Sequence, residues 1–227
     1  MKKIIIPLLF CIPVSVFAQL DAIGTFNRYV TESWAGQYQR VGQYKVKGSP
    51  YLFGESMSGK IKYQGGDFVK TDKILYDLND QKVGPEVNGQ IFKADQTIEA
   101  FVIQFPGKYS NEEALFKSAA TYGAKKGPAY FNVLSEGSAV HLLKAYRIKV
   151  VADPSNMMDK EARIFEQFVE YYIYDVQAKS ISKVKMNKKD VADALKATPA
   201  LLTKLNAYTG MLSTELDLLS LVETLNQ

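Results

Sequence analysis

From Gln43 onward, short runs of alternating polar and apolar residues are separated by turn signals at close intervals. The two clearest signals are Gly65-Gly66, between 60–64 and 67–71, and Asn88-Gly89, between 82–87 and 90–94. Both dipeptides accept the positive φ angles that tight hairpin turns require. The pattern predicts a β-hairpin at each signal and mostly antiparallel β-structure over the whole region.

Three longer runs also alternate as strands do: 97–105, 139–151 and 164–176, the last followed by a turn at 177–179 and a partner strand at 180–186. In the first run Phe101, Ile103 and Phe105 form the larger apolar set, and we expect that set to face the core. The run 164–176 is dense in aromatic and β-branched residues, which favour strands.

One segment within this region has a helical signature instead. Ser110-Asn111-Glu112-Glu113 has the spacing of a capping box, in which a serine and a glutamate satisfy the first backbone N–H groups of a helix. A helix from there to about Tyr122 would carry Leu115, Phe116 and Ala119 on one face. We therefore expect one helix inserted among the strands.

After Asn187 the apolar residues follow the period of helices. Asn187 can cap a first helix, Thr198-Pro199 can begin a second, and Ser213 can cap a third. The third helix has an apolar stripe at the i, i+3, i+4, i+7 spacing of a buried face. Its members are Leu218, Leu221, Val222 and Leu225. The region of about 187–227 is therefore predicted to be a helical segment docked on the β-domain.

These elements together predict an α+β fold in which β-structure dominates. Its architecture would be an antiparallel curved sheet or a partly closed barrel, with one inserted helix and a C-terminal helical segment. The chain has 227 residues and no linker of biased composition. Residues 19–227 are therefore expected to form a single domain around one core.

The N-terminus has the layout of a secretory signal peptide. Met1-Lys2-Lys3 precedes an apolar run, 4–17, that is shorter than the roughly 20 residues of a membrane-spanning helix. The small residues near its end suit a signal peptidase, so we expect cleavage between Ala18 and Gln19. The alternative is that this segment is retained as a membrane anchor.

The single cysteine, Cys11, follows Phe10 inside the apolar run, a context in which lipid attachment is not expected. Because Cys11 would leave with the signal, the mature chain would form no disulfide. The formal net charge is +4 and no long run of one sign occurs, so the composition indicates neither nucleic acid nor an anionic membrane as a partner. We also expect no transmembrane segment in the mature chain. The predicted location is the periplasm, the outer-membrane surface or the exterior.

The residue types that build active sites are scarce. One histidine, His141, is present, which excludes a histidine-based zinc site. It lies in an alternating run without a G-x-S-x-G elbow, so we interpret it as an ordinary strand residue. Asp72, Asp77 and Asp80 form no calcium-binding loop and are interpreted as turn and strand-end residues. Neither a Walker A loop nor a G-x-G-x-x-G fingerprint occurs, and no cofactor is expected.

Three groups of residues leave functional alternatives open. Four carboxylates could serve a glycoside hydrolase or be ordinary charges on strand faces: Glu99, Glu136, Glu166 and Glu170. Three tyrosines could bind a glycan or a peptide strand, or be packing residues: Tyr171, Tyr172 and Tyr174. Four lysines could meet anionic envelope polymers or keep an edge soluble: Lys183, Lys185, Lys188 and Lys189.

Four parts of the chain carry a resemblance to a family. They are Gly48-Ser49-Pro50-Tyr51-Leu52, Ile74-Leu75-Tyr76-Asp77-Leu78, Tyr130-Phe131-Asn132-Val133-Leu134-Ser135-Glu136-Gly137 leading to Leu142-Leu143-Lys144-Ala145-Tyr146, and a close that combines Tyr171-Tyr172-Ile173, Lys188-Lys189-Asp190-Val191 and the leucine-rich last helix. On these segments the chain resembles an uncharacterised family of exported proteins from Gram-negative, gliding-type and related bacteria. The resemblance spans most of the mature chain and consists of packing patterns. It implies an envelope or secreted location and supplies no catalytic residue.

The sequence therefore favours an exported protein with a non-enzymatic binding or structural role, whose partner is an envelope or extracellular ligand. The rival function is a carboxylate-based hydrolase of glycoside type. Two acids converging in a concave pocket would favour the enzyme, whereas a flat or groove-like aromatic face would favour the binding protein.

Overall fold

The computed structural model describes residues 38–92, 96–106 and 111–227. The predicted cleavage site at Ala18 and Gln19 lies outside the described residues, as does Cys11. The described strands are β1 (Tyr38–Val41), β2 (Tyr44–Lys47), β3 (Met57–Tyr63), β4 (Phe68–Asp77), β5 (Lys82–Val87), β6 (Gln90–Ile91), β7 (Ile98–Pro106), β8 (Asn111–Ser118), β9 (Tyr130–Glu136), β10 (Val140–Ala152), β11 (Ala162–Asp175) and β12 (Ser180–Val184). The described helices are the short 3-10 helices η2 (Leu52–Gly54) and η3 (Ala119–Tyr122) and the α-helices α1 (Lys188–Leu195), α2 (Pro199–Ala207) and α3 (Glu215–Asn226).

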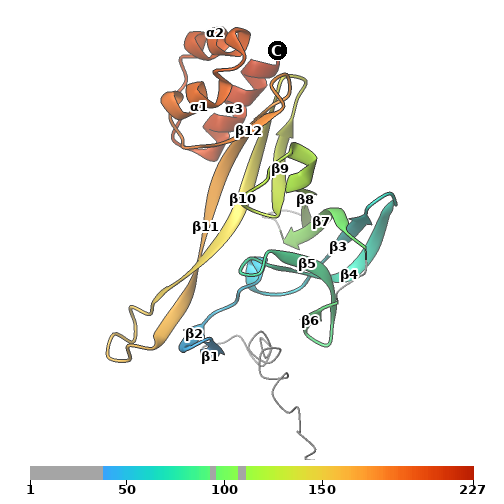
Figure 1. Ribbon diagram of the computed structural model, residues 1–227, viewed down its shortest axis with the longest axis vertical. Coiled ribbons are helices and arrows are strands. Elements are labelled where there is room, and N and C mark those ends of the chain that lie inside the picture. Colours follow the sequence, from blue (N-terminus) through green and yellow to red (C-terminus); the bar gives the residue numbers. More distant parts are fainter. Residues whose placement is uncertain (1–37, 93–95, 107–110) are drawn as a thin grey trace, which may run out of the picture.

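All the described strands join one sheet (Figure 1). Neighbours follow the order β1-β2-β11-β10-β9-β8-β7-β3-β4-β5-β6, and β12 pairs with β11. The pairing of β2 with β11 is parallel, and the other described pairings between these strands are antiparallel. Since β1 and β6 do not pair with each other, the described sheet is open. The β-dominant α+β class is confirmed, and the prediction of a partly closed barrel is wrong.

Both predicted hairpins are confirmed. β3 and β4 are joined through Gly65-Gly66, where Gly65 has a φ of 76°. β5 and β6 are joined through Asn88-Gly89, whose φ angles are 53° and 76°. Positive φ at both central residues gives the turn a twist that matches the flanking strands.

The helix predicted at 110–122 is wrong. Asn111–Ser118 is a strand, β8, that pairs with β7 on one side and β9 on the other, and only the four residues of η3 are helical. Ala114 and Phe116 are buried two residues apart, which is the period of a strand. The apolar Leu115 between them hid this period in the sequence. Pairing with two neighbouring strands outweighs a local helix-start signal.

β7 faces the core as predicted, with one irregularity. Phe101 and Ile103 are fully buried and Phe105 is half-buried. Ile98 joins the same core cluster although it precedes Phe101 by an odd number of residues. The register between β3 and β7 shifts by one residue at Glu99, and this bulge turns Ile98 onto the buried face.

The C-terminal helical segment is confirmed. Asn187 caps α1 by accepting a hydrogen bond from the N–H of Asp190, and α2 begins at Pro199. The predicted cap of the third helix is wrong by one residue: Thr214, not Ser213, is the N-cap. The Thr214 hydroxyl accepts from the N–H of Asp217, and the Asp217 carboxylate accepts from the N–H of Thr214. The predicted stripe is fully buried: Leu218, Leu221, Val222 and Leu225.

Asn226, at the end of α3, fastens that helix to the start of β10. Its Oδ1 accepts hydrogen bonds from the N–H groups of Ala139 and Val140, and its Nδ2 donates to the carbonyls of Val140 and Val222, all at 2.9 Å. The side chain occupies the space next to Gly137, where a Cβ would lie 2.1 Å from the Asn226 amide. Gly137 is therefore required for this contact, and the amide has its hydrogen-bonding capacity satisfied.

β10 and β11 form a long hairpin that extends past the other strands at one end (Figure 1). We call residues 140–145 and 170–175 the covered half, and residues 146–152 and 162–169 the projecting half. In the covered half, Leu142 and Ile173 face the three α-helices on one side. Leu143 and Ala145 pack with Phe131 on the other side. This half of the hairpin is enclosed on both faces.

The projecting half has fewer neighbours. β9 pairs with β10 only from His141 to Lys144. Beyond that point Tyr146 and Ile148 of β10 pack against the core of β3, β4, β7 and β8. No helix of the described chain is long and apolar enough to cross a membrane.

Candidate functional surface

The edge of β11 opposite β10 is shared by two strands. β2 pairs with Ala162, Arg163 and Ile164 in parallel, and β12 pairs with 171–175 in antiparallel. On this edge, no described strand pairs with the residues in between, 165–170, which we call the β11 window; on the opposite edge these residues pair with β10. At ~3.3 Å per residue the window is about 20 Å of extended backbone. Its outward N–H and C=O groups are those of an open strand edge.

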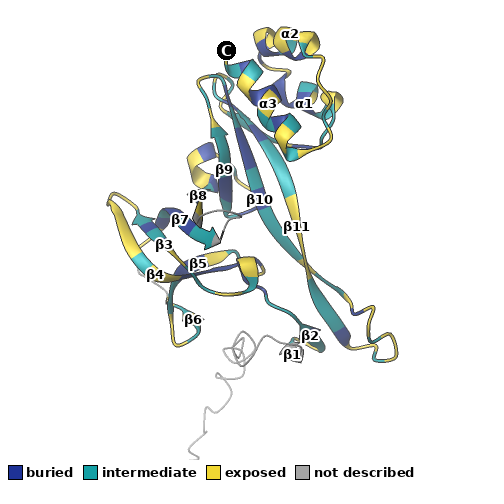
Figure 2. Cartoon of the chain, turned by 180° about the vertical axis from the view of Figure 1, so that it is seen from behind, coloured by how far each residue is buried: buried dark blue, intermediate teal, exposed yellow. Residues whose placement is uncertain are grey.

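The central four residues of the β11 window are exposed. Each residue from 166 to 169 is exposed, and Figure 2 shows this stretch as a yellow section of β11 between more buried parts. Phe168 is 38% exposed and Val169 is 42% exposed. Because successive strand residues point to opposite faces, Phe168 and Val169 present an apolar side chain on each side of the sheet.

At the N-terminal end of the window, the segment that follows β2 turns away from the edge of β11. Gly48 has a φ of 95°, and a Cβ there would lie 3.9 Å from the Cβ of Phe165. The side chain of Gln167 donates a hydrogen bond to the carbonyl of Tyr51 at 3.0 Å. The segment from Gly48 to Tyr51 therefore crosses one face of β11 without adding a described strand to its edge.

Charges around the window are compensated. Lys149 Nζ lies 3.1 Å from Glu166 and 5.7 Å from the centroid of the Phe168 ring. At the other end, Glu170 accepts hydrogen bonds from Lys183 at 2.6 Å and from the Tyr172 hydroxyl at 2.9 Å. Burial alone would raise the pKa of Glu170, but these two hydrogen bonds together with the positive charges of Lys183 and Arg147 outweigh burial and hold the pKa below its ordinary value. The window is therefore close to neutral as a whole.

The four carboxylates considered for a hydrolase are each paired with a lysine. The pairs are Glu99 with Lys62 at 3.4 Å, Glu136 with Lys117 at 2.5 Å, Glu166 with Lys149 at 3.1 Å and Glu170 with Lys183 at 2.6 Å. The last two carboxylates lie four residues apart on β11, so their Cα atoms are about 13 Å apart, and each carboxylate is bound to a different lysine. The lowered pKa of Glu170 is also opposite to what a general acid needs.

His141 is packed between aromatic rings. Its ring centroid lies 5.4 Å from that of Tyr174 and 6.1 Å from that of Tyr122. Nδ1 is 3.8 Å from a carboxylate oxygen of Glu136, too far for a hydrogen bond. Burial lowers the pKa of His141, and Lys117 lowers it further, although Glu136 opposes both. The environment favours the neutral form and is that of a packed strand residue.

The three tyrosines of β11 are packed and do not form an open aromatic face. The Tyr172 ring lies 4.9 Å from that of Phe131, and the Tyr174 ring lies 5.2 Å from that of Tyr122. The Tyr171 hydroxyl donates to Glu215 on α3 at 2.7 Å. The structure therefore gives these residues a packing role in the covered half.

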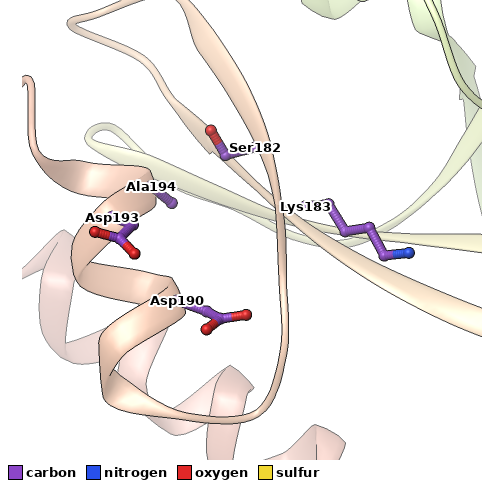
Figure 3. A pocket seen from close by; sticks show the side chains of 5 residues that line it. All are labelled: Ser182, Lys183, Asp190, Asp193 and Ala194. Carbon is purple, nitrogen blue, oxygen red and sulfur yellow. The ribbon is translucent and has the colours of Figure 1, made fainter.

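A shallow hollow of about 420 Å³ lies between β12 and α1 (Figure 3). It is lined by Ser182, Lys183, Asp190, Asp193 and Ala194. Figure 3 shows the Lys183 side chain directed away from α1, in keeping with its bond to Glu170. No group of three metal-binding side chains occurs among the residues that the structure describes. The hollow therefore offers little with which to hold a ligand.

Lys188, Asp77 and Asp80 have structural positions, whereas the interpretation of Asp72 as a turn or strand-end residue is wrong because Asp72 lies within β4. Lys188 Nζ donates to the carbonyl of Tyr208. Asp77 Oδ1 accepts from the N–H groups of Asn79 and Asp80, at 2.8 and 2.9 Å, and so organises the turn after β4. Burial raises the pKa of Asp77 to about 6. These contacts agree with the interpretation of Asp77 and Asp80 as turn residues.

Sequence reasoning missed Phe168 and Val169 as surface residues. Glu166, Gln167 and Glu170 are polar and lie in or beside the exposed part of the run 164–176, but Phe168 and Val169 have the same aromatic and β-branched character as the buried part. The break arises because β2 and β12, which lie far apart in the sequence, stop short of each other on the same edge. Comparison with known proteins adds no relative: no family model, curated protein or solved structure matches the chain.

Proposed function

We propose that the protein is exported by its N-terminal signal and acts in the cell envelope or outside the cell as a non-enzymatic binding protein. We further propose that the β11 window is its binding surface and that the partner contributes an extended polypeptide segment. The observation that carries this proposal is an open strand edge that exposes Phe168 and Val169 and lies between two parts of the same edge that are already paired.

The window has the properties that addition of a strand requires. The same edge accepts β2 in parallel and β12 in antiparallel, so its backbone geometry is suited to pairing. A partner segment would gain main-chain hydrogen bonds, each contributing roughly 0.5–1.5 kcal/mol net. Its alternate side chains would contact Phe168 on one face and Val169 on the other.

Comparison with another open strand edge, on β4, supports the choice of the β11 window as the binding surface. Residues 68–73 of β4 pair with β3 alone, since β5 joins β4 only from Ile74 onward. That edge carries Lys70, Asp72 and Lys73, and lysines at an edge are typical of strands protected against further pairing. The β11 window contains no lysine, proline or glycine.

A second copy of the chain fits the window less well than another polypeptide. If two windows paired in antiparallel with Phe168 opposite Phe168, Glu166 of each would face Glu170 of the other. Like charges directly opposite each other destabilise a strand pair. The hydrolase alternative has less support still, because each candidate carboxylate is paired with a lysine.

Site-specific photocrosslinking in the native host tests the binding surface. A photoreactive phenylalanine analogue at Phe168 should give a discrete protein adduct, whereas the same analogue at Phe68, which is 44% exposed on the β4 edge, should not. Equal adducts at both positions, or none at Phe168, would contradict the proposal.

Export is tested separately by fractionation and intact mass. The mature protein should be recovered outside the cytoplasm and should begin at Gln19. A membrane-bound species that retains Met1 would show that the predicted cleavage is wrong.

A further inference from the structure

The loop that joins β10 to β11, residues 153–161, forms the far end of the projecting half (Figure 1). It carries two adjacent methionines, and both are almost fully exposed: Met157 at 84% and Met158 at 96%. Single exposed apolar residues are ordinary, but a pair at the outermost point of a hairpin is the first part of the chain that a flat surface would meet.

The loop is internally bonded. The N–H of Asn156 donates to the carbonyl of Asp153, that of Asp159 to Asn156, and that of Ala162 to Asp159, at 3.0 to 3.2 Å. The Asp159 carboxylate is held by Lys45 of β2 at 3.0 Å. These bonds give the loop a defined shape on either side of Met157 and Met158, so their exposure is a property of the folded loop.

The surroundings of the loop are basic, in contrast to the balanced chain as a whole. Segments 41–47 and 149–163 contain five basic residues, Lys45, Lys47, Lys149, Lys160 and Arg163, and three acidic ones, Asp153, Asp159 and Glu161. Lys45 is paired with Asp159, Lys149 is paired with Glu166, and Asp153 is buried. Of the remaining charged residues, Lys47, Lys160 and Arg163 are basic and Glu161 is acidic, so the exposed charge of these segments is positive.

We propose that this loop docks on an anionic phospholipid surface, with Met157 and Met158 entering the boundary between headgroups and acyl chains. Apolar side chains flanked by basic residues match a surface that has an apolar interior under negative headgroups. The contact is peripheral and does not require a membrane-spanning element. It is independent of the β11 window, which would stay accessible to a polypeptide partner.

Sedimentation of the mature protein with lipid vesicles tests this inference. The protein should bind vesicles of phosphatidylethanolamine and phosphatidylglycerol at low salt, and both high salt and pure phosphatidylcholine should weaken binding. The double substitution Met157→Glu and Met158→Glu should lower the partition coefficient at least about tenfold, because two apolar side chains lose their burial. A Lys160→Glu substitution, which leaves both methionines intact, should weaken binding several-fold, by roughly the effect of reversing one charge near the surface.

The control is Met211→Glu, which makes the same methionine-to-glutamate change once, at another exposed methionine, 77% exposed, in the segment before α3. It should bind vesicles as the parent does, and so should Phe168→Ser in the β11 window. Thermal melts should be unchanged in all variants, since the substituted side chains are exposed. Absence of vesicle binding by the parent, binding that ignores headgroup charge and salt, or equal losses in the Met211 control and the double variant would each overturn the inference. Crosslinking of the loop to a protein without vesicle binding would do the same.

Discussion

The covered and projecting halves of the β10–β11 hairpin belong to the same two strands in one continuous register, yet they differ in what lies against them. Leu142 and Ile173 in the covered half are enclosed by helices that follow them in the chain. Phe168 and Val169 in the projecting half are exposed. The difference shows that the alternation of a strand places residues on faces, whereas burial depends on which distant segments cover those faces.

The two halves should therefore contribute unequally to stability. A fully buried aliphatic side chain contributes roughly 1.5–3 kcal/mol relative to an exposed one. The covered half has many such residues, and the β11 window has none among 166–169. Side chains in the window are consequently available for binding without a large cost to the fold.

The largest expected effect is at the helical cover of the hairpin. Leu221→Ala should lower the free energy of unfolding by roughly 2–5 kcal/mol, because Leu221 is fully buried against the covered half. Glu223→Ala, on the exposed side of α3, should change it by less than about 0.5 kcal/mol. Chemical denaturation measures both. Equal stability of the two variants would mean that α3 does not cover the hairpin.

A smaller loss is expected where α3 is fastened to β10. Asn226→Ala should cost about 1–3 kcal/mol, because the N–H of Ala139 and the N–H and C=O of Val140 lose their partners. Thr224→Ala, whose hydroxyl bonds only within the helix, is the control and should have little effect. If Asn226→Ala unfolds at the same denaturant concentration as the parent, the contact does not hold the helix in place.

The covered half should also respond to acid through His141. Its pKa is lowered, mainly by burial, so the unfolded chain binds a proton more readily. The free energy of unfolding should then fall as the pH drops below about 6.5, until the lower folded-state pKa is passed. Asp77 acts in the opposite sense: its raised pKa of about 6 gives stability that is present at low pH and lost as the pH rises through that value.

The contribution of His141 is isolated by a double difference. The change in unfolding free energy between pH 7.5 and pH 5 is measured in the parent and in His141→Gln, and the Asp77 contribution cancels because both proteins contain it. The acid loss should be smaller in the variant. An identical loss in both proteins would place His141 in an environment that does not oppose its charge.

The smallest effect is expected in the projecting half. Val169→Thr should change the unfolding free energy by less than about 0.5 kcal/mol, because Val169 is exposed and threonine keeps the β-branched shape. Ile173→Thr, on the same face of β11 and fully buried, should cost more than about 1 kcal/mol. Similar losses for the two substitutions would contradict the division of the hairpin into two halves.

Much of this fold is predictable from local patterns. The turns at Gly65 and Asn88, the long strands and the cap at Asn187 are each determined within a few residues. The sequence predicts a helix where β8 lies because the capping-box spacing is a local signal. The strand is stabilised by pairing with β7 and β9, and nothing in the local sequence indicates that pairing. The sequence predicts Ser213 as the N-cap of α3 because Ser213 and Thr214 both carry a hydroxyl that can cap a helix. In the structure Thr214 is the N-cap, since its hydroxyl and backbone N–H bond reciprocally with Asp217.

The candidate surface is less predictable than the fold. The parallel pairing of β2 with β11 joins residues more than a hundred positions apart, and nothing near either strand signals it. The carboxylates and tyrosines that looked functional in the sequence are paired or packed, whereas the exposed Phe168 and Met158 resemble ordinary strand and loop residues. A residue is exposed when no distant segment packs over it, and the local sequence pattern contains no information on which distant segments do so.

Amide hydrogen exchange along β11 tests the central claim most directly. In the unbound mature protein, the amides of 171–175 lie between β10 and β12 and should exchange orders of magnitude more slowly than the outward-facing amides of the β11 window. Within 165–170, alternate residues should be protected, since every second amide points to β10. Uniform slow exchange from 162 to 175 would show that the edge is already covered, and the window would then not be an open binding surface.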